Sequence, residues 1–286
     1  MRQIFFALLF FGVGLCATPP KWFLQNQIGK DWFVGVGSGN NAKSAKLEAF
    51  SDLASMISVE VDSTFSLNKQ RVGNIFSDNA RSAIQLKVED LKLLDINILN
   101  SEIIDGIYYV QVGIKKAKVL DQIHNEILKE LEKTSLEYYE KCNFLDLKSF
   151  KSLQGVLRQL DSKVKIFDAL SQEKFTNQKL EKFVEIYSKN LPKPQANLIY
   201  ENLDLNLQDS LSKEFLKFVA LTPEKLNRAS SILVQGKDLD GKNIINLMIL
   251  DCQGIVIFQE KFEFDASSLK RANFIIFKAI KKWIEE

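Results

Sequence analysis

The placement of proline constrains this chain more than any other feature of its sequence. Prolines occur at positions 19, 20, 192, 194 and 223, so residues 21–191 contain none. Proline removes a backbone donor and keeps the residue before it out of the helical region. Long helices are therefore permitted before Pro192, and a break is required there. We predict a domain boundary at Pro192-Lys193-Pro194.

The region 18–115 is predicted to form a small domain in which a helix packs on an antiparallel sheet. Helical spacing of apolar residues, alternation of apolar residues and turn residues mark its elements. Asp105-Gly106 is a turn pair typical of a tight hairpin. The expected elements are a strand at 32–37, a helix at 43–57, a strand at 58–67, a helix at 74–87, and strands at 91–98 and 107–114.

The region 116–191 is predicted to be a helical hairpin that turns around residues 143–146. Apolar residues spaced by three and four form one continuous seam on its second half, and the first half has the same rhythm. Packing between the two halves is favoured, and coiled-coil dimerisation is the alternative. The seam consists of Phe150, Leu153, Leu157, Leu160, Val164 and Phe167.

The region 195–286 is predicted to be a second small α+β domain, so the fold class of the whole chain is α+β. Turn residues at Asp240-Gly241 and at 251–254 separate three strands into a meander. Ser267-Ser268 is expected to cap the last helix, whose apolar side faces the sheet. The expected elements are a helix at 204–218, strands at 232–236, 243–250 and 255–264, and the closing helix.

The first 17 residues resemble a signal peptide. A short positive start precedes an uncharged run, Ile4–Leu15, that is too short to span a bilayer. Cys16 is the one candidate modification site, since a bacterial lipoprotein carries its lipidated cysteine there. Leu15, however, occupies a place that normally requires a small residue, and cleavage near Cys16 or Ala17 without lipidation is the alternative. We expect an exported protein in the periplasm or at the periplasmic face of the outer membrane.

Charge and residue counts exclude several classes of function. The 38 basic and 36 acidic residues leave a net charge of +2, which argues against a nucleic-acid partner. A single histidine, His124, disfavours a catalytic triad and a histidine-rich zinc site. Cys142 and Cys252 are far apart in the sequence. We expect them to be free buried thiols, although a bridge between them stays open.

Three short motifs have a weak chemical interpretation. Gly35–Ser44 resembles a phosphate-binding loop, but Ala42 stands where that loop needs glycine, so a glycine-rich turn is favoured. Asp238–Gly241 has the wrong spacing for a calcium loop. His124 lies among polar neighbours on an expected helix, where a solvated side chain is the simpler interpretation. We therefore predict no catalytic residue, no cofactor and no metal site.

Several segments of the first domain form a recognisable ensemble: Pro20–Phe23, Val34–Gly39, Ala42, Ala45, Ala49, Leu53, Val59–Ser63, Glu102 and Gly106–Val112. Together they resemble a bacterial family, that of the twenty-kilodalton membrane-associated lipoprotein of Helicobacter. In the last domain, the segments Val234–Gly236, Leu247–Asp251 and Gly254–Val256 and the closing helix are similar, more faintly, to the amino-terminal domain of TolB and to the middle domain of the flagellar T protein.

The resemblance implies an envelope protein with a helix against a small antiparallel sheet and no catalytic residues. We predict a non-enzymatic exported protein that binds other envelope or outer-membrane proteins, with membrane contact only through an amino-terminal lipid. One alternative is an accessory protein of the flagellar basal-body ring, with ring components as partners. The other is a periplasmic binder of a small ligand. The sequence leaves the oligomeric state open.

Overall fold

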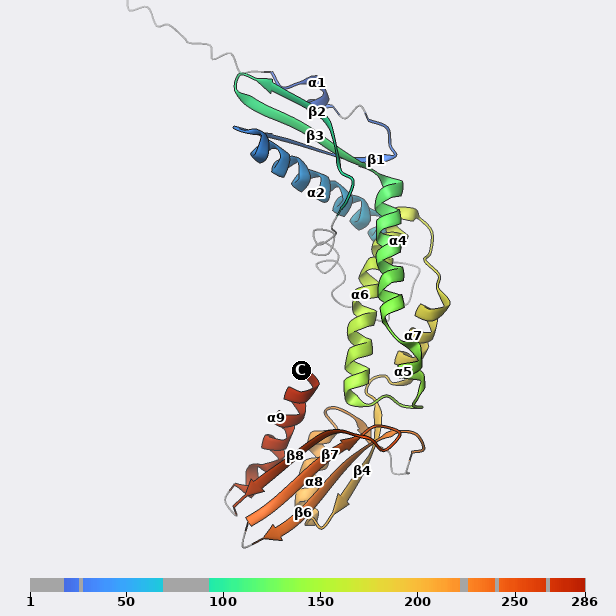
Figure 1. Ribbon diagram of the computed structural model, residues 1–286, viewed down its shortest axis with the longest axis vertical. Coiled ribbons are helices and arrows are strands. Elements are labelled where there is room, and N and C mark those ends of the chain that lie inside the picture. The colour runs from blue at the N-terminus through green and yellow to red at the C-terminus, as the bar shows by residue number, and fades with distance from the viewer. Residues whose placement is uncertain are drawn as a thin grey trace, which may run out of the picture. The chain divides into compact units, whose positions relative to one another are not determined.

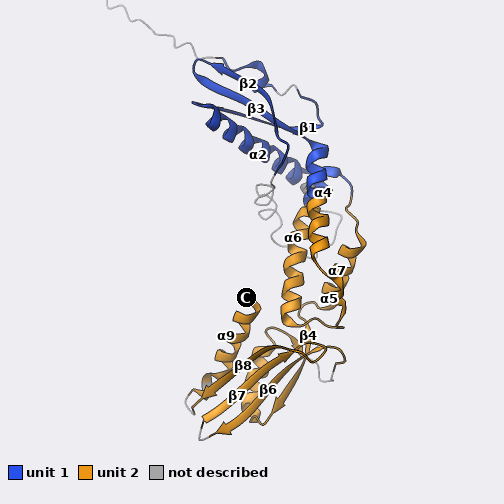
Figure 2. Ribbon diagram, viewed as in Figure 1, with its two compact units in different colours: residues 1–124, 166–173 blue, residues 125–165, 174–286 orange. Residues whose placement is uncertain are grey.

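The computed structural model describes residues 18–25, 28–68, 93–221, 226–239, 242–265 and 268–285. The chain divides into two compact units, residues 1–124 with 166–173 and residues 125–165 with 174–286 (Figure 2). Each unit combines helices with a sheet, so the predicted α+β class is confirmed. The finer division at 115/116 and 191/195 stays a prediction. Among the described residues, no helix has the length and apolar character needed to cross a membrane.

The sheet of the first unit has three antiparallel strands in the order β1-β3-β2 (Figure 1). They are β1 (Trp32–Gly39), β2 (Asn97–Ile104) and β3 (Ile107–Lys115). Asp105 and Gly106 join β2 to β3 with φ angles of 49° and 80°. Two positive φ angles are what a type I′ hairpin turn requires, and the predicted hairpin is confirmed. The prediction of a strand at 91–98 is wrong, because the strand begins only at Asn97 and continues to the turn.

Helix α2 (Ala42–Asn68) packs against β1 and β3. The prediction of a strand at 58–67 is wrong, because the helix continues through this segment. Side chains at every fourth position are buried from the beginning of the helix through Val61, and the hydroxyl of Ser58 donates to the carbonyl of Ala54. The alternation of Val59 and Val61 resembles a strand, but Val61 belongs to the helical row. This row consists of Ala45, Ala49, Leu53, Ile57 and Val61.

The short helix α1 (Lys21–Leu24) covers part of the opposite face of the sheet. The ring of Phe23 lies 5.0 Å from that of Tyr109 on β3. The side chain of Gln111, which is buried, donates to the carbonyl of Trp22. Strand β3 is therefore buried on both faces. The predicted helix at 74–87 lies outside the described residues, as do the signal segment and Cys16.

Four helices follow β3: α4 (Lys116–Lys133), α5 (Leu136–Glu140), α6 (Leu147–Ser171) and α7 (Gln178–Lys189). Two contacts pair α4 with α6. The rings of His124 and Phe167 are 5.8 Å apart, and Glu126 forms an ion pair of 2.8 Å with Lys163. The earlier residue of α4 contacts the later residue of α6, so the two helices are antiparallel. The predicted hairpin is therefore confirmed. The predicted seam is buried from Phe150 to Leu160, while beyond it Ile166 is buried and Val164 and Phe167 are half-buried.

The sheet of the second unit has five strands in the order β5-β4-β6-β7-β8. The meander of β6 (Ser230–Leu239), β7 (Lys242–Leu250) and β8 (Val256–Phe264) confirms the prediction. Two strands that were not predicted, β4 (Gln195–Glu201) and β5 (Ala220–Leu221), extend the sheet beyond β6 in parallel. The turn at Asp240-Gly241 lies outside the described residues.

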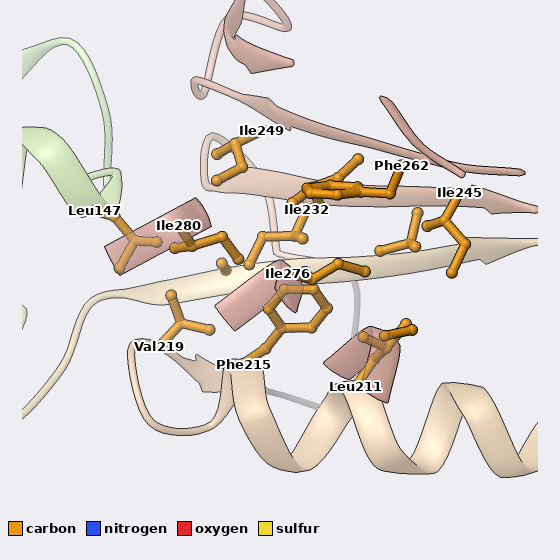
Figure 3. Packing of buried hydrophobic residues seen from close by; sticks show 14 of the residues in the cluster. Leu147, Leu211, Phe215, Val219, Ile232, Ile245, Ile249, Phe262, Ile276 and Ile280 are labelled. Atoms are coloured by element: carbon orange, nitrogen blue, oxygen red, sulfur yellow. The ribbon is translucent and has the colours of Figure 1, made fainter. Parts of the chain in front are cut away.

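Helices α8 (Leu205–Phe215) and α9 (Ala272–Glu285) pack on this sheet and against each other. Figure 3 shows Leu211 and Phe215 of α8 meeting Ile276 of α9 and Ile232 of the sheet. Leu147, the first residue of α6, belongs to the same core and so joins the middle helices to the sheet within this unit. The predicted apolar side of the last helix is confirmed.

The start of α9 differs from the expectation. Ser267 lies outside the described residues, and the Ser268 side chain caps neither α9 nor the short 3-10 helix η1 (Leu269–Arg271) that precedes it. The Ser268 hydroxyl accepts from the Asp265 amide, and the Asp265 carboxylate accepts from the Ser268 amide. This reciprocal pair stabilises the turn between β8 and η1.

Candidate functional site

The glycines of β1 serve close packing of the sheet on α2. A Cβ atom on Gly35 would overlap the backbone of Ala49 and Leu53, and one on Gly37 would overlap the backbone of Ala45. Strand and helix therefore approach closely because both present residues with little or no side chain. This supports the favoured interpretation of a glycine-rich turn over a phosphate-binding loop.

The helix end that follows this turn is occupied by the chain's own side chains. Asn41 precedes α2, and its side-chain oxygen accepts from the amide of Ser44 at 2.9 Å. Farther along α2, the carboxylate of Glu48 accepts from the amide of Ser38, and that of Asp52 accepts from the amide of Val36. Two carboxylates beside the turn would repel a phosphate group. They also occupy amides on the outer edge of β1, where strand addition would need them free.

The remaining sequence motifs are separated in the structure. His124 is exposed on α4 beside Phe167, and Asp238 lies near the end of β6, opposite Asn243 of β7. Glu130 forms an ion pair of 3.6 Å with Lys133 on the surface of α4, where such pairs contribute little to stability. Within the described ranges, no group of three or more His, Cys, Asp or Glu side chains is placed to hold a metal ion.

Cys142 and Cys252 form a disulfide, so the prediction of free thiols is wrong. Their Cα atoms are 5.6 Å apart although 110 positions separate them in the sequence. Cys142 follows α5, and Cys252 lies in the turn between β7 and β8. Two hydrogen bonds also hold the Cys142 loop to the segment just before β6: the amide of Asn143 donates to the carbonyl of Arg228, and the guanidinium of Arg228 donates to the carbonyl of Lys141.

A cavity of about 610 Å³ lies beside the disulfide, between α5, the α5–α6 loop and α7. Its charges are paired, Lys182 with Glu140 at 3.8 Å and Lys189 with Glu185 at 2.8 Å. The Lys189 ammonium lowers the pKa of Glu185, which stays ionised at neutral pH. The lining residues are Tyr139, Glu140, Cys142, Asn143, Phe144, Lys182, Glu185, Ile186, Lys189 and Asn190.

The chemistry of this cavity suits binding better than acid–base work. Burial raises the pKa of Tyr139, whose hydroxyl lies 3.0 Å from that of Ser152. A general base works best with a pKa near the operating pH, whereas this tyrosine keeps its proton and Glu185 has lost its own. The walls offer aromatic surface and balanced charge.

The outer edges of the two sheets differ in how they are protected. Carboxylates occupy amides of β1, β5 has only two residues, and β8 carries the exposed charges Glu260, Lys261 and Glu263. Short strands and charged side chains prevent unwanted strand pairing. In the described part of the chain, the edge formed by β2 (Asn97–Ile104), the β2 edge, is long, has one charged residue and has no carboxylate on its amides.

The β2 edge presents apolar side chains to solvent. Ile98 is 50% exposed and Ile103 is 59% exposed, and Glu102 is the one charged residue of the strand. This site was not predicted from the sequence. The sequence did contain a signal for it. A strand that runs into the Asp105-Gly106 turn must include residues 100–104, and this segment has one charge and no lysine or proline, the residues that usually protect an edge strand.

No family model and no curated protein sequence matches this chain. Among solved structures, the chain is similar to the secreted protein HP1454 from the human pathogen Helicobacter pylori, with 21% identity and a TM-score of 0.57. The match covers 88% of this chain and 95% of that chain. TolB from Acinetobacter baumannii matches with 15% identity and a TM-score of 0.27, over 32% of this chain and 28% of that chain. The likeness to HP1454 shows a shared fold, and membership of the lipoprotein family stays a prediction.

Proposed function

We propose that this chain is an exported, non-enzymatic protein of the cell envelope that binds another protein through the β2 edge. Export is supported by the signal-like start, by the Cys142–Cys252 disulfide and by the fold shared with a protein described as secreted. Disulfides persist in oxidising compartments such as the periplasm and are rare in the cytosol. The periplasm or the periplasmic face of the outer membrane is the proposed location.

The β2 edge is the observation that carries the binding role. A sheet edge displays a row of backbone donors and acceptors that another strand can pair with. Three of the four described edges are short, charged or covered, whereas the β2 edge is eight residues long and exposes Ile98 and Ile103. Among the edges of the described residues, the β2 edge is therefore the one suited to a protein partner.

Photo-crosslinking in the native cell tests this role. A photo-reactive amino acid replaces Ile103 on β2 or, as the matched control, Val256 on the charged β8 edge, which is 45% exposed. The proposal predicts a discrete adduct from position 103 in the envelope fraction and none from position 256. Equal labelling at both positions, or none at position 103, would overturn it. Recovery of the protein in the cytosol with both cysteines reduced would overturn the export proposal.

Membrane attachment through Cys16 belongs to the same proposal. A lipid on Cys16 would hold the chain at a membrane, and Cys16→Ser would then release it into the periplasmic fraction. An unchanged fractionation would contradict lipid anchoring and leave the binding role intact.

The cavity beside the disulfide supports a second candidate function, binding of a small periplasmic ligand. Its volume of about 610 Å³ falls within the usual range of about 300 to 1,000 Å³ for ligand sites. A ligand at 100 times its dissociation constant would stabilise the protein by about 2.7 kcal/mol. Thermal shifts with a panel of small metabolites, compared between the parent and Ile186→Glu, would detect such a ligand. A panel without any shift would count against it.

A further inference from the structure

We propose that the partner at the β2 edge is a second copy of this chain, whose β2 pairs antiparallel with the first and joins the two three-stranded sheets into one. This inference rests on the proposed binding role of the β2 edge and goes beyond it by naming the occupant and the register.

A bulge places both isoleucines on the same face. Ile98 pairs with Val112 and Asn100 with Gln111, so Leu99 is an extra residue in β2. Ile103 pairs with Tyr108, and Val112 and Tyr108 lie an even number of residues apart on β3. Directly opposed residues share a face, and successive residues of a strand alternate. Without the extra residue, isoleucines five positions apart would point to opposite faces.

This shared face is the one that α2 covers on the neighbouring strands. Val110 and Val112 are buried on it, while Tyr109 points to the opposite face and contacts Phe23 of α1. The helix packs against β1 and β3, and β2 extends the same face outward. Ile98 and Ile103 therefore continue an apolar layer beyond the helix, where apolar side chains of a paired second strand can contact them.

Two copies of β2 have a register that satisfies this pattern. When Ser101 lies opposite Ser101 of the second copy, its neighbour Asn100 lies opposite Glu102 of the second copy, which pairs an amide with a carboxylate. Because Leu99 is the extra residue of the bulge, Ile98 then lies opposite Ile103 of the second copy on the same face. The alternative register centred on Glu102 would place two carboxylates face to face, and like charges directly opposite are destabilising.

The symmetry and the size of this contact set the expected behaviour. A two-fold axis through Ser101 gives the closed, self-complementary interface that is commonest among oligomers. Eight residues per copy are fewer than the roughly 20 to 30 per side of a standard interface, so association should be weak. We expect dimers at concentrations of about 10 µM to about 1 mM.

Cysteine crosslinking of the purified full chain tests the occupant and the register together. In a Cys16→Ser background, Ser101→Cys supplies one unpaired thiol on the two-fold axis, and Glu260→Cys supplies a matched thiol on the β8 edge. Opposed residues of paired strands have Cα atoms about 4.5 to 5.5 Å apart, within disulfide range. Mild oxidation should yield a covalent dimer from Ser101→Cys and leave Glu260→Cys monomeric. Dimers formed equally by both variants, or by neither, would overturn the proposal.

A second pair of variants tests the isoleucines without a crosslink. Ile103→Lys places a charge in the proposed interface, and Val256→Lys places one on the β8 edge at a similarly exposed apolar residue. Light scattering should show self-association weakened at least tenfold by Ile103→Lys and unchanged by Val256→Lys. Circular dichroism checks that both variants keep the parent's folded spectrum.

The outcomes separate this proposal from the binding role itself. A Ser101→Cys chain that stays monomeric, together with an adduct of the photo-reactive residue at position 103 to a different envelope protein, overturns the second copy and keeps the binding role. A photo-adduct with the mass of two copies supports both. Monomers in solution and no adduct in the cell overturn both.

Discussion

Removing the Cys142–Cys252 disulfide should cost the second unit a large part of its stability. The bridge closes a loop across 110 positions of the sequence, which holds the middle helices to the β7–β8 turn even in the unfolded chain. In the chain-entropy model, a loop of this length removes about 16 cal/mol/K from the unfolded state, or about 4.8 kcal/mol at 25 °C. Typical domains are stable by only about 5–15 kcal/mol.

The perturbation is the double replacement Cys142→Ser with Cys252→Ser, compared with Cys16→Ser as the control. Urea unfolding followed by circular dichroism gives the free energy of unfolding of each variant. We expect the free energy of unfolding of the double variant to fall by about 3 to 5 kcal/mol. The range reaches below the chain-entropy value because measured disulfide stabilisation is often smaller than that model predicts. The control should unfold like the parent.

Two results would refute this reasoning. A loss below about 1 kcal/mol would mean that the bridge does not restrain the unfolded chain as the loop-closure model requires. Alkylation of both thiols in the unreduced native protein would mean that Cys142 and Cys252 are not bonded at all. The second result would also remove one of the supports for export.

Three further predictions follow from the packing. Gly37→Val should destabilise the chain by about 3 kcal/mol, because the valine side chain would overlap the backbone of α2. Gly155→Ala should stabilise it by about 0.5 to 1 kcal/mol, because the space beside this residue of α6 is open. Urea midpoints of the two variants and the parent measure both effects. Asn190→Ala should cost about 1 to 3 kcal/mol on the same measure by leaving the buried amide of Leu145 unpaired. Burial raises the pKa of Tyr200 to about 12, above the unfolded value of 10.0. The folded state therefore keeps the full stability contributed by the protonated tyrosine below pH 10 and loses it between pH 10 and 12. Tyr200→Phe should remove this part of the fall in stability, measured as urea midpoints across that pH range.

The elements that sequence periodicity predicted well are those whose burial is set locally. The strand beginning at Trp32, the hairpin turn at Asp105-Gly106, the meander of the second sheet and the final helix all carry their own apolar pattern or turn chemistry. In each case, the side chains that face the core repeat at the period of the element. The predicted fold class therefore followed from local patterns alone.

The elements that sequence periodicity did not predict depend on residues far away in the sequence. Val59 and Val61 have strand-forming side chains, but the i, i+4 row that ends at Val61 is held by the sheet, which keeps the segment helical. Strand β4 has no clear alternation because apolar Ile199 is exposed while polar Asn197 is buried. The Cys142–Cys252 bridge depends on the docking of α5 beside the β7–β8 turn, which spacing in the sequence does not reveal.

The candidate site lay further from sequence reasoning than the fold did. An open edge is defined by what the other edges have, namely the carboxylates of Glu48 and Asp52 beside β1 and the charges along β8. That comparison requires the strand order of both sheets. The bulge at Leu99, which brings Ile98 and Ile103 to one face, is likewise visible only in the register with β3.

Hydrogen exchange of the backbone amides at low and high protein concentration tests the central claim most directly. If a second copy adds to the β2 edge, amides within Asn97–Ile104 should exchange more slowly as the concentration rises, while those of Val256–Phe264 on the β8 edge should not change. Exchange of the β2 amides that is independent of concentration, or slowed equally at both edges, would contradict the account.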